Sequence, residues 1–441
     1  MLTSDVAAAT GGRLVGPDVT VSGATIDSRL VTGGELFVPV VAERDGHDFV
    51  PAALAAGAAA YLTARRPVPQ AEGATAVEVD DTGRALTALG AHGRDLLDGG
   101  IDGGVDGRVV GITGSVGKTS VKDLLAAALA AGWRTTASAG SFNNELGVPL
   151  TLLGAPAGTQ ALVIEMGARG AGHVADLCAV ARPTVGVVTR VAAVHTETFG
   201  TIDDVAKAKS ELVAALPASG VAVLNAADPR VAAMARRTDA RVVRFGEGGD
   251  VRAEAVELDA ELHPTFRLAT PWGRADVRLA VRGLHMVDNA LAAAAAALVC
   301  DVPLDATAAA LGTAGVSRWR MELVTLPSGA RLLNDAYNAN PVSMAAALRA
   351  LAGLEAGRRV AVLGLMAEIG ASSDDEHRAV GALARELGLE VVAVGVPAYG
   401  GTPVADVAAA AAALGDLGPD DAVLLKGSRV AGLERLVDLL R

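Results

Sequence analysis

A glycine-rich stretch near residue 115 has the composition of a phosphate-binding loop. It reads GITGSVGKTS from 111 to 120, and the residues that define it are Gly114, Gly117, Lys118 and Thr119. Backbone N–H groups at a helix N-terminus point at bound phosphate, a lysine adds charge beside the β- and γ-phosphates, and a threonine hydroxyl can bind Mg²⁺. The commonest motif of this kind has a glycine where this chain has Ile112, so the loop is the shorter GxxGKT form. A plain strand–turn–helix connection does not need Lys-Thr after the second glycine, and we therefore predict a nucleoside triphosphate site.

Two segments after this loop place amide and carboxylate groups beside apolar runs. SFNNELGVPLTLL, at 141–153, contains Asn143 and Asn144, and the apolar run ALVIE ends at Glu165. Because α/β folds bind ligands at the carboxyl ends of their strands, Glu165 is a candidate to complete a Mg²⁺ shell. Taken alone, the amides also suit an ordinary polar loop, and the carboxylate also suits a structural role.

Histidine and lysine side chains follow in the same region. His195 comes after the apolar run TVGVVTRV, and Lys209 lies in the expected helix DVAKAKSELVAALP. His285 and Asn289 are four residues apart at the start of another expected helix, so they share one face. Single residues of these types are more often caps or solvated side chains, so each is a candidate whose role depends on the rest of the site.

These residues must be positioned by strands and helices, and the sequence pattern predicts an α/β protein. Short β-branched runs at 108–113, 161–167, 184–191 and 220–225 alternate with helical segments, as in a buried, mostly parallel sheet. A second series, at 331–335, 358–365, 390–395 and 421–427, predicts a separate doubly wound, Rossmann-like domain. The first hundred residues predict a small α/β domain, and the glycine-rich run 99–107 reads as a linker. We therefore expect three domains, at 1–105, 106–315 and 316–441.

Composition narrows the class of protein. The 441 residues carry a formal net charge of −12, without the dense basic face that nucleic acid requires, so we expect no nucleic-acid partner. Cys178 and Cys300 stand alone, without the spacing of a zinc finger or a disulfide framework. The N-terminus lacks signal-peptide features, and the apolar run 290–300 is too short to span a bilayer. We expect a cytoplasmic protein without membrane insertion, and a monomer.

Taken in order, the motifs resemble those of the Mur ligases along essentially the whole chain. The discriminating segments are FNNELGVPLTLL, EMGARGAGH and NDAYNANP, joined by HTETFG, AKAKSEL, GLHMVDNALAA, RWRME, GLMAEIG and LLKGSR. They are most similar to the family member that adds D-alanyl-D-alanine. The resemblance implies an N-terminal UDP-MurNAc-binding domain, a central ATPase domain and a C-terminal ligase domain.

The resemblance also implies roles for particular residues. At the UDP end the candidates are Ser28, Arg29, Asp45, Gly46 and His47, and Asn143 and Asn144 are candidates for the substrate. The implied ATP site consists of Gly114, Ser115, Val116, Gly117, Lys118, Thr119, Ser120, His285, Asn289, Arg320, Asp335, Tyr337 and Asn340, with Asn338 at the same end. Asp335 matches the ribose-binding aspartate, and Arg320 matches an arginine that reaches the nucleotide from the third domain's linker.

The implied reaction is ATP-dependent amide formation in peptidoglycan synthesis. UDP-MurNAc-tripeptide, with meso-diaminopimelate or lysine as its third residue, is activated as an acyl phosphate, which the amine of D-alanyl-D-alanine captures. Lys118, His195 and Lys209 are the implied catalytic residues. Two Mg²⁺ ions are implied, the first held by Thr119 and Glu165. The second Mg²⁺ is assigned to His195 and Lys209. In the family, the lysine that matches Lys209 is carbamylated by CO₂.

Four departures from the family pattern bear on local contacts, namely Arg190 for a common Asn, HTETFG for the more usual HLExFG, Met286 for a frequent Asn and Ala336 for a common Ser. Two alternatives stay open. Another Mur ligase or a folylpolyglutamate-type synthetase would keep the chemistry and change the substrate. A phosphate-loop protein acting as a switch or binding module would need neither Glu165, His195 nor Lys209.

Overall fold

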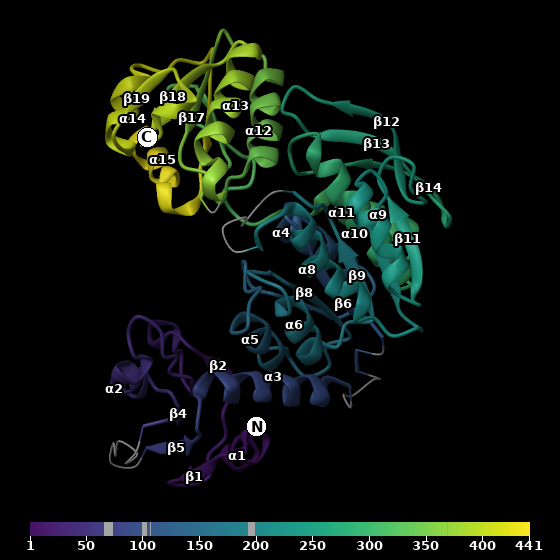
Figure 1. Ribbon diagram of the computed structural model, residues 1–441, viewed down its shortest axis with the longest axis vertical. Coiled ribbons are helices and arrows are strands. Elements are labelled where there is room, and N and C mark those ends of the chain that lie inside the picture. The colour runs from purple at the N-terminus through teal and green to yellow at the C-terminus, as the bar shows by residue number, and fades with distance from the viewer. Residues whose placement is uncertain (66–73, 99–103, 106, 193–198, 368) are drawn as a thin grey trace. The chain divides into compact units, whose positions relative to one another are not determined.

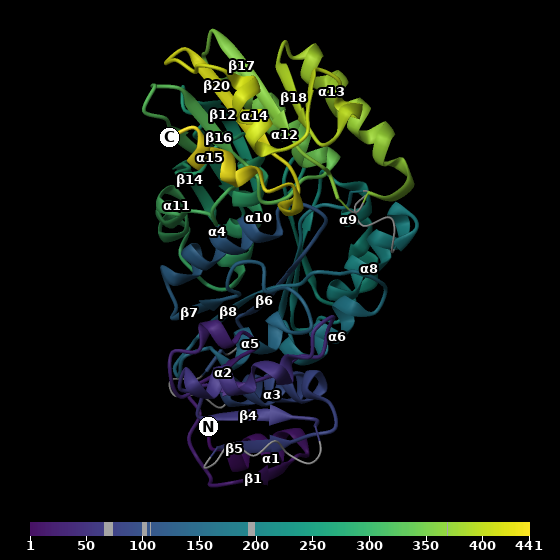
Figure 2. The ribbon, with the colours of Figure 1, turned by 90° about the vertical axis from the view of Figure 1, so that its left-hand side faces the viewer.

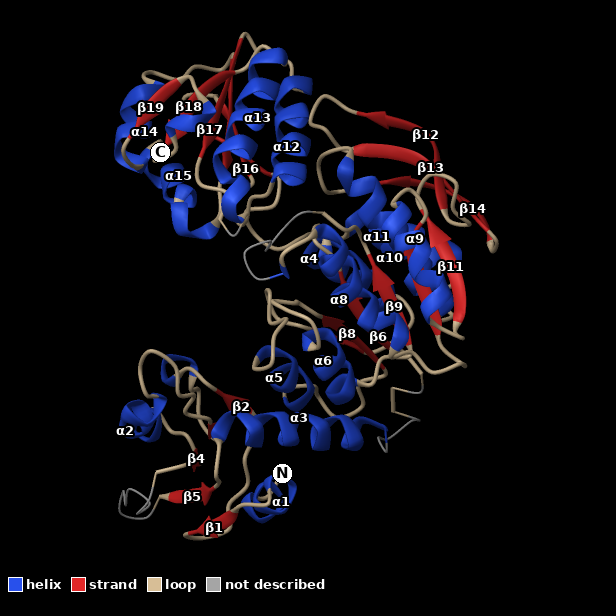
Figure 3. Cartoon of the chain, viewed as in Figure 1, coloured by secondary structure: helices blue, strands red, loops and turns tan. Residues whose placement is uncertain are grey.

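The computed structural model is an α/β protein built on four sheets, and it describes residues 1–65, 74–98, 104–105, 107–192, 199–367 and 369–441 (Figures 1 and 3). The chain divides into two compact units. The first contains Met1–Gly111, Trp133–Gly167 and His173–Val185, and the second contains Ile112–Gly132, Ala168–Gly172 and Gly186–Arg441.

The N-terminal sheet has five strands in the order β1-β5-β4-β3-β2. Its strands are β1 (Arg13–Val15), β2 (Ala24–Thr25), β3 (Leu36–Phe37), β4 (Ala60–Thr63) and β5 (Thr75–Glu78), and only β1 runs antiparallel to its neighbour. The accompanying helices are α1 (Thr3–Thr10), η1 (Ser28–Leu30), η2 (Gly46–Phe49), α2 (Val50–Ala55) and α3 (Thr82–Asp98). Val38, Leu62, Val77 and Leu86 lie in its core. Because β2 to β4 are parallel, the segments that follow them, including η1 and η2, emerge at one edge of the sheet.

The second sheet has six strands in the order β11-β10-β9-β6-β8-β7. They are β6 (Val109–Thr113), β7 (Thr135–Ala137), β8 (Ala161–Glu165), β9 (Val185–Val188), β10 (Val221–Asn225) and β11 (Arg241–Phe245). The helices are α4 (Lys118–Ala130), α5 (Gly147–Leu153), α6 (His173–Ala181), α8 (Ile202–Ala214), α9 (Pro229–Ala233), η4 (Met234–Arg237), α10 (His285–Val299) and α11 (Leu304–Thr313). Every residue of β6 and β8 is buried, as expected of strands covered on both faces.

Helix α10 is buried along most of its length. It packs against α4, α11, β10 and β11, and its buried residues include Ala290 and the uninterrupted alanines 292–297. Consecutive residues cover every side of a helix, so alanine is present wherever a neighbouring element packs on this stretch, and its methyl group, the shortest apolar side chain, allows close approach. The helix that carries His285 and Asn289 is thus fixed against α4, the helix that begins at the phosphate loop.

A three-stranded antiparallel sheet, which the sequence analysis did not anticipate, follows β11. It consists of β12 (Arg252–Leu258), β13 (Pro264–Thr270) and β14 (Gly273–Arg278), with an irregular register between Glu254 and Glu257. Most of β12 is exposed, and charged residues are spread along it, so its apolar pattern is too weak to read as a strand.

The C-terminal sheet has six strands in the order β15-β16-β20-β17-β18-β19. Its strands β16, β17, β18 and β20 are labelled in Figure 2. They are β15 (Glu322–Thr325), β16 (Arg331–Asn334), β17 (Arg358–Leu363), β18 (Glu390–Val394), β19 (Thr402–Val404) and β20 (Asp421–Lys426), with only β15 antiparallel. The helices are α12 (Pro341–Gly353), η5 (Gly370–Ser372), α13 (Ser373–Glu386), η6 (Pro397–Tyr399), α14 (Val407–Leu414), η7 (Arg429–Ala431), η8 (Leu433–Arg435) and α15 (Leu436–Leu439). Parallel pairing of β16 with β20 brings the segments that follow Asn334 and Leu425 to the same edge.

The predicted α/β class with mostly parallel sheets is confirmed, whereas the boundaries at residues 105 and 315 stay predictions. Among the described residues, no helix has both the length and the apolar character needed to cross a membrane.

Candidate active site

The phosphate loop connects β6 to α4 and is fixed by residues that follow β9. Ser115 donates its backbone N–H to the carbonyl of Arg190 at 2.7 Å, and Thr189 donates its hydroxyl to the carbonyl of Val116 at 2.6 Å. Lys118 donates from Nζ to the carbonyl of Gly114 at 2.8 Å. Arg190 takes part in this loop through its backbone, so the departure at that position leaves the contact intact.

The two glycines of the loop are required by close contacts as well as by backbone conformation. Gly114 has φ +149°, and a Cβ there would lie 1.9 Å from Thr189 Oγ1. Gly117 has φ +85°, and its Cβ would lie 2.5 Å from Asn289 Oδ1. The second contact shows that α10 brings Asn289 beside the loop.

We expect Gly114→Ala to weaken ATP binding by about a hundredfold or more, because the methyl group displaces Thr189 and forces a strained backbone. Calorimetric titration with ATP measures the effect. Gly23→Ala is the matched control, because no atom of the described chain lies within 4 Å of a Cβ at Gly23. Equal ATP affinity in the Gly114 variant and in this control would contradict the prediction.

Lys209 is buried in α8, with only 2% of its surface exposed. The helix begins at a capping box between Thr201 and Asp204, which places Lys209 two turns into the helix. Burial lowers the pKa of the Lys209 ammonium well below its usual value, and the charge of Lys118 lowers that pKa further. This site therefore favours a neutral amine, which is the form that reacts with CO₂.

Glu165 ends β8 as a buried carboxylate, 1% exposed. Its Oε1 accepts a hydrogen bond from Asn143 Nδ2 at 2.8 Å, whereas its Oε2 has no hydrogen-bond partner among the described residues. A buried carboxylate oxygen without a donor is costly unless a ligand such as a cation occupies that side. Asn143 is thus brought to Glu165, while Asn144 Oδ1 accepts from the N–H groups of Leu146 and Gly147 at the start of α5.

Nowhere in the described ranges do three or more His, Cys, Asp or Glu side chains gather as a metal cluster. Such a cluster is not needed for Mg²⁺, which usually binds through one or two carboxylates together with substrate phosphates. Thr119, buried at the first turn of α4, and the buried carboxylate of Glu165 each offer an oxygen of the kind that Mg²⁺ binds. The predicted ligand His195 lies outside the described residues.

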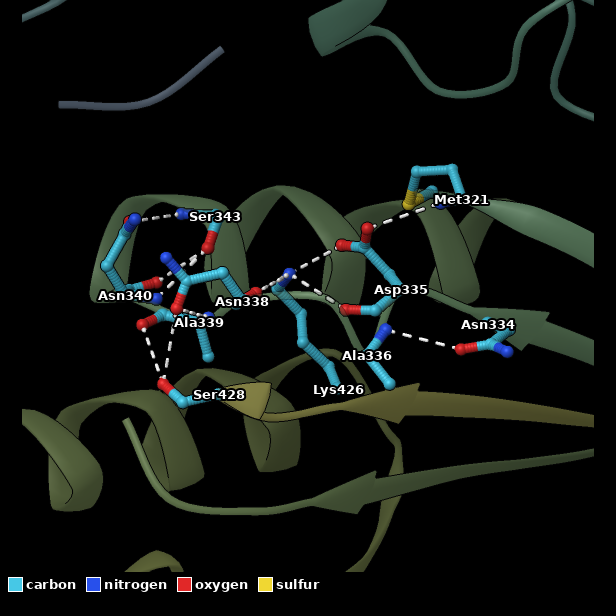
Figure 4. A network of polar contacts seen from close by, with 10 residues as sticks. All are labelled: Met321, Asn334, Asp335, Ala336, Asn338, Ala339, Asn340, Ser343, Lys426 and Ser428. Carbon is cyan, nitrogen blue, oxygen red and sulfur yellow. Dashed lines mark hydrogen bonds and ion pairs between the residues drawn. The ribbon is translucent and has the colours of Figure 1, made fainter. Parts of the chain in front are cut away.

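Asp335 lies at the carboxyl end of β16 within a polar network that also involves β20 (Figure 4). Lys426, 2% exposed, donates from Nζ to Asp335 Oδ2 at 2.5 Å and to the Asn338 carbonyl at 3.1 Å. Met321 donates its N–H to Asp335 Oδ1 at 3.2 Å. Lys426 was not among the predicted site residues, although its position after the apolar run DAVLL was a signal for a strand-end ligand.

The other predicted nucleotide residues have distinct surroundings. The guanidinium of Arg320 lies over the ring of Tyr337 at 4.4 Å, and its Nε is buried without a hydrogen-bond partner in the described chain. Asn340 caps α12 by accepting from the N–H of Ser343 at 3.0 Å. Burial lowers the pKa of His285, Asp335 opposes that shift and Lys426 adds to it, so these three groups interact.

Two further departures are Met286 and Ala336. Met286 is buried, and its sulfur accepts from Asn289 Nδ2 at 3.4 Å. Ala336 is buried as well and donates its N–H to Asn334 Oδ1 at 3.3 Å. Neither residue replaces a group in the proposed metal sites.

The predicted UDP residues lie in the segments that emerge at one edge of the N-terminal sheet. His47 Nε2 accepts from the N–H of Ala64 at 3.0 Å, so Nδ1 carries the proton that faces Asp45 Oδ1 at 2.6 Å. Arg65, which the sequence analysis did not select, pairs with Asp45 at 2.7 Å. The backbone N–H of His47, which donates to Asp45 Oδ1 at 3.0 Å, and the side chains of Arg65 and His47 hold the pKa of the Asp45 carboxyl well below its usual range.

Ser28 and Arg29 form the short helix η1 at the same edge. Asp27 caps this helix by accepting from the N–H of Arg29, and the Arg29 side chain, 86% exposed, pairs with Asp27 at 2.6 Å. These contacts lower the pKa of Asp27 to about 2. Gly46 is required by packing, because a Cβ there would lie 2.6 Å from the backbone of Val40.

Comparison with known proteins finds similarity along nearly the whole chain. Residues 112–297 match the family model of the Mur ligase middle domain, and residues 319–429 match that of the Mur ligase glutamate ligase domain. A UDP-N-acetylmuramoyl-tripeptide–D-alanyl-D-alanine ligase of Mycobacterium tuberculosis is 42% identical, over 94% of this chain and 91% of its own.

Solved structures agree with that similarity. MurF from Acinetobacter baumannii has a TM-score of 0.88 at 32% identity, covering 99% of this chain and 98% of its own. MurF from Thermotoga maritima in complex with ADP has a TM-score of 0.81 at 27% identity, covering 95% and 96%.

Proposed function

The chain belongs to the Mur ligase family, and from that premise we propose that it joins D-alanyl-D-alanine to UDP-N-acetylmuramoyl-tripeptide with cleavage of ATP. The substrates follow from the relative's 42% identity over 94% of this chain, a span too long to omit the N-terminal sheet. The structural observation that carries the chemistry is the phosphate loop, with Lys209 buried near the charge of Lys118. The reaction belongs to peptidoglycan synthesis, and we propose that it occurs in the cytoplasm, where ATP is available.

The chemistry proceeds in two steps. The terminal carboxylate of the tripeptide attacks the γ-phosphorus of ATP, so that an acyl phosphate forms and ADP leaves. The amine of the dipeptide then attacks the acyl carbon, the amide bond forms, and inorganic phosphate leaves as the nitrogen loses a proton. Phosphoryl transfer spreads negative charge over several oxygens, so Lys118 and the N–H groups of the loop stabilise it by position and charge.

We assign the predicted ATP-loop residues 114–120 to the phosphates, with Asn289 beside them. Asp335 is assigned to accept a hydrogen bond from a ribose hydroxyl. The other predicted nucleotide contacts are those of His285, Arg320, Tyr337 and Asn340. The buried, unpartnered Nε of Arg320 supports a role in binding an anion.

Magnesium would be held by Thr119 and Glu165 at the first site and by His195 and a carbamylated Lys209 at the second. When bound, the ions neutralise charge on the phosphates and the transferring group. The unpartnered Glu165 Oε2 supports the first assignment, and the lowered pKa of Lys209 supports the second. Carbamylation converts the amine into an anion able to face a cation.

Ser28, Arg29, Asp45, Gly46 and His47 are assigned to the UDP end of the substrate, and Asn143 and Asn144 to its other end. The placement of the first five at one edge of a mostly parallel sheet supports a shared binding site.

An omission assay tests the function. Purified protein is given ATP, Mg²⁺, UDP-MurNAc-tripeptide and D-alanyl-D-alanine, and phosphate release is measured as each is left out in turn. We expect release only in the complete mixture, with separate arms for the meso-diaminopimelate and lysine tripeptides. Normal ATP binding without phosphate release in either arm would contradict ligase activity. Release with a folate and glutamate instead would favour the synthetase alternative.

A further inference from the structure

Residues 317–321, here called the strap, connect the region of α11 to β15 and have an unusual backbone. Trp319 has φ +60° and Met321 has φ +55°, both in the left-handed region that side chains other than glycine rarely adopt. Two such residues within three positions persist only where surrounding contacts hold them. The strap is therefore held in one conformation by its neighbours.

Two carboxylates hold the two ends of the strap. Asp123 Oδ2 accepts from both the N–H and the hydroxyl of Ser317, each at 2.7 Å. Asp335 Oδ1 accepts from the N–H of Met321 at 3.2 Å. Asp123 lies on α4, five residues after Lys118, so the first of these contacts ties the strap to the phosphate-loop helix.

Arg320 lies between these two anchors. Its guanidinium is stacked on Tyr337, and its Nε remains buried without a partner among the described residues. Trp319, the preceding residue, is fixed by two contacts. Its ring lies 4.0 Å from the guanidinium of Arg429, and its backbone carbonyl accepts from the N–H of Tyr337 at 3.3 Å. These contacts restrict the backbone of the strap, so the position of Arg320 depends on where Ser317 and Met321 are fixed.

We propose that Asp123 is a positioning residue for the reaction. Asp123 binds Ser317 and so fixes the position of the strap. In that position Arg320 can contact the nucleotide bound at the phosphate loop. The proposal rests on the proposed function, in which Arg320 contacts ATP. Helix α4 then has two roles. It carries Lys118, which contacts the phosphates, and through Asp123 it fixes the distance between Arg320 and the phosphate loop.

Ser317 is the residue to change, because Asp123 also pairs with the buried Lys122 at 2.9 Å and its removal would disturb that lysine. We expect Ser317→Ala to raise the Kd of a non-hydrolysable ATP analogue about five- to tenfold, since a hydrogen bond to a carboxylate is lost. The KM for D-alanyl-D-alanine should not change. Ser317→Thr keeps the hydroxyl and should restore binding, and Ser328→Ala, in the turn between β15 and β16, is the matched control.

A double-mutant cycle with Arg320 separates positioning from general support of the fold. In an Arg320→Met background, Ser317→Ala should produce no further rise in the Kd of the analogue. Arg320→Gln, which also removes the positive charge, serves in the same way if the methionine variant does not fold, and thermal unfolding confirms that each variant is folded. An unchanged Kd in Ser317→Ala, or an equal rise in both backgrounds, would overturn the proposal. A wild-type protein that binds the analogue but forms no product would instead count against the proposed function.

Discussion

Lys209→Ala is expected to lower turnover by about a thousandfold or more, while the affinity for ATP changes little. The proposed carbamate carries the negative charge that faces the second cation, and alanine can supply no such group. Removing a charge that stabilises the transferring phosphoryl group affects turnover more than ground-state binding. Steady-state phosphate release, measured beside ATP titration, separates the two effects.

A chemical rescue makes this prediction specific to the carbamate. Acetate or formate added to Lys209→Ala should restore part of the turnover, because a small carboxylate can occupy the vacated position. Lys207→Ala is the matched control, since Lys207 is exposed two residues earlier on the same helix and should behave as wild type. Undiminished turnover in Lys209→Ala, or a ¹³C-bicarbonate sample of the wild type without a carbamate resonance, would refute the assignment.

Glu165→Gln should reduce turnover by about a hundred- to a thousandfold and raise the Mg²⁺ concentration required for half-maximal activity. Glutamine can still accept from Asn143 Nδ2, so the fold around β8 should persist. The amide would place an N–H where Oε2 lies, the oxygen that has no hydrogen-bond partner among the described residues, and so replace the proposed cation ligand by a hydrogen-bond donor.

A Mg²⁺ titration of activity checks this prediction, with Glu145→Gln as control. Glu145 is exposed in the neighbouring segment and should leave the titration unchanged. A Glu165→Gln enzyme with the Mg²⁺ requirement of the wild type would show that Glu165 is not a metal ligand.

The sequence predicted the parts of the site whose geometry is local. The phosphate loop follows β6 and opens α4 because glycines, lysine and threonine specify that turn within seven residues. His285 and Asn289 share a helix, and spacing alone places them on one face.

The parts that escaped prediction depend on pairing over long distances. Lys426 meets Asp335, 91 residues earlier, only because β20 lies beside β16 in the sheet order. Arg65 meets Asp45 because β3 and β4 are neighbours, which no local pattern reveals. The sheet β12–β14 was missed because its most exposed strand, β12, has charged residues spread along it, and its weak apolar pattern does not stand out from a loop.

The alanine-rich stretch of α10 has a consequence for how the nucleotide site can respond to its substrates. Alanine has no side-chain rotamers, so a contact built from its methyl groups has no soft degree of freedom with which to absorb a displacement. We therefore expect α4 and α10 to move as one rigid body. A displacement of His285 or Asn289 should then produce an equal displacement of Lys118. Compliance in this part of the protein must then come from segments outside the helix pair.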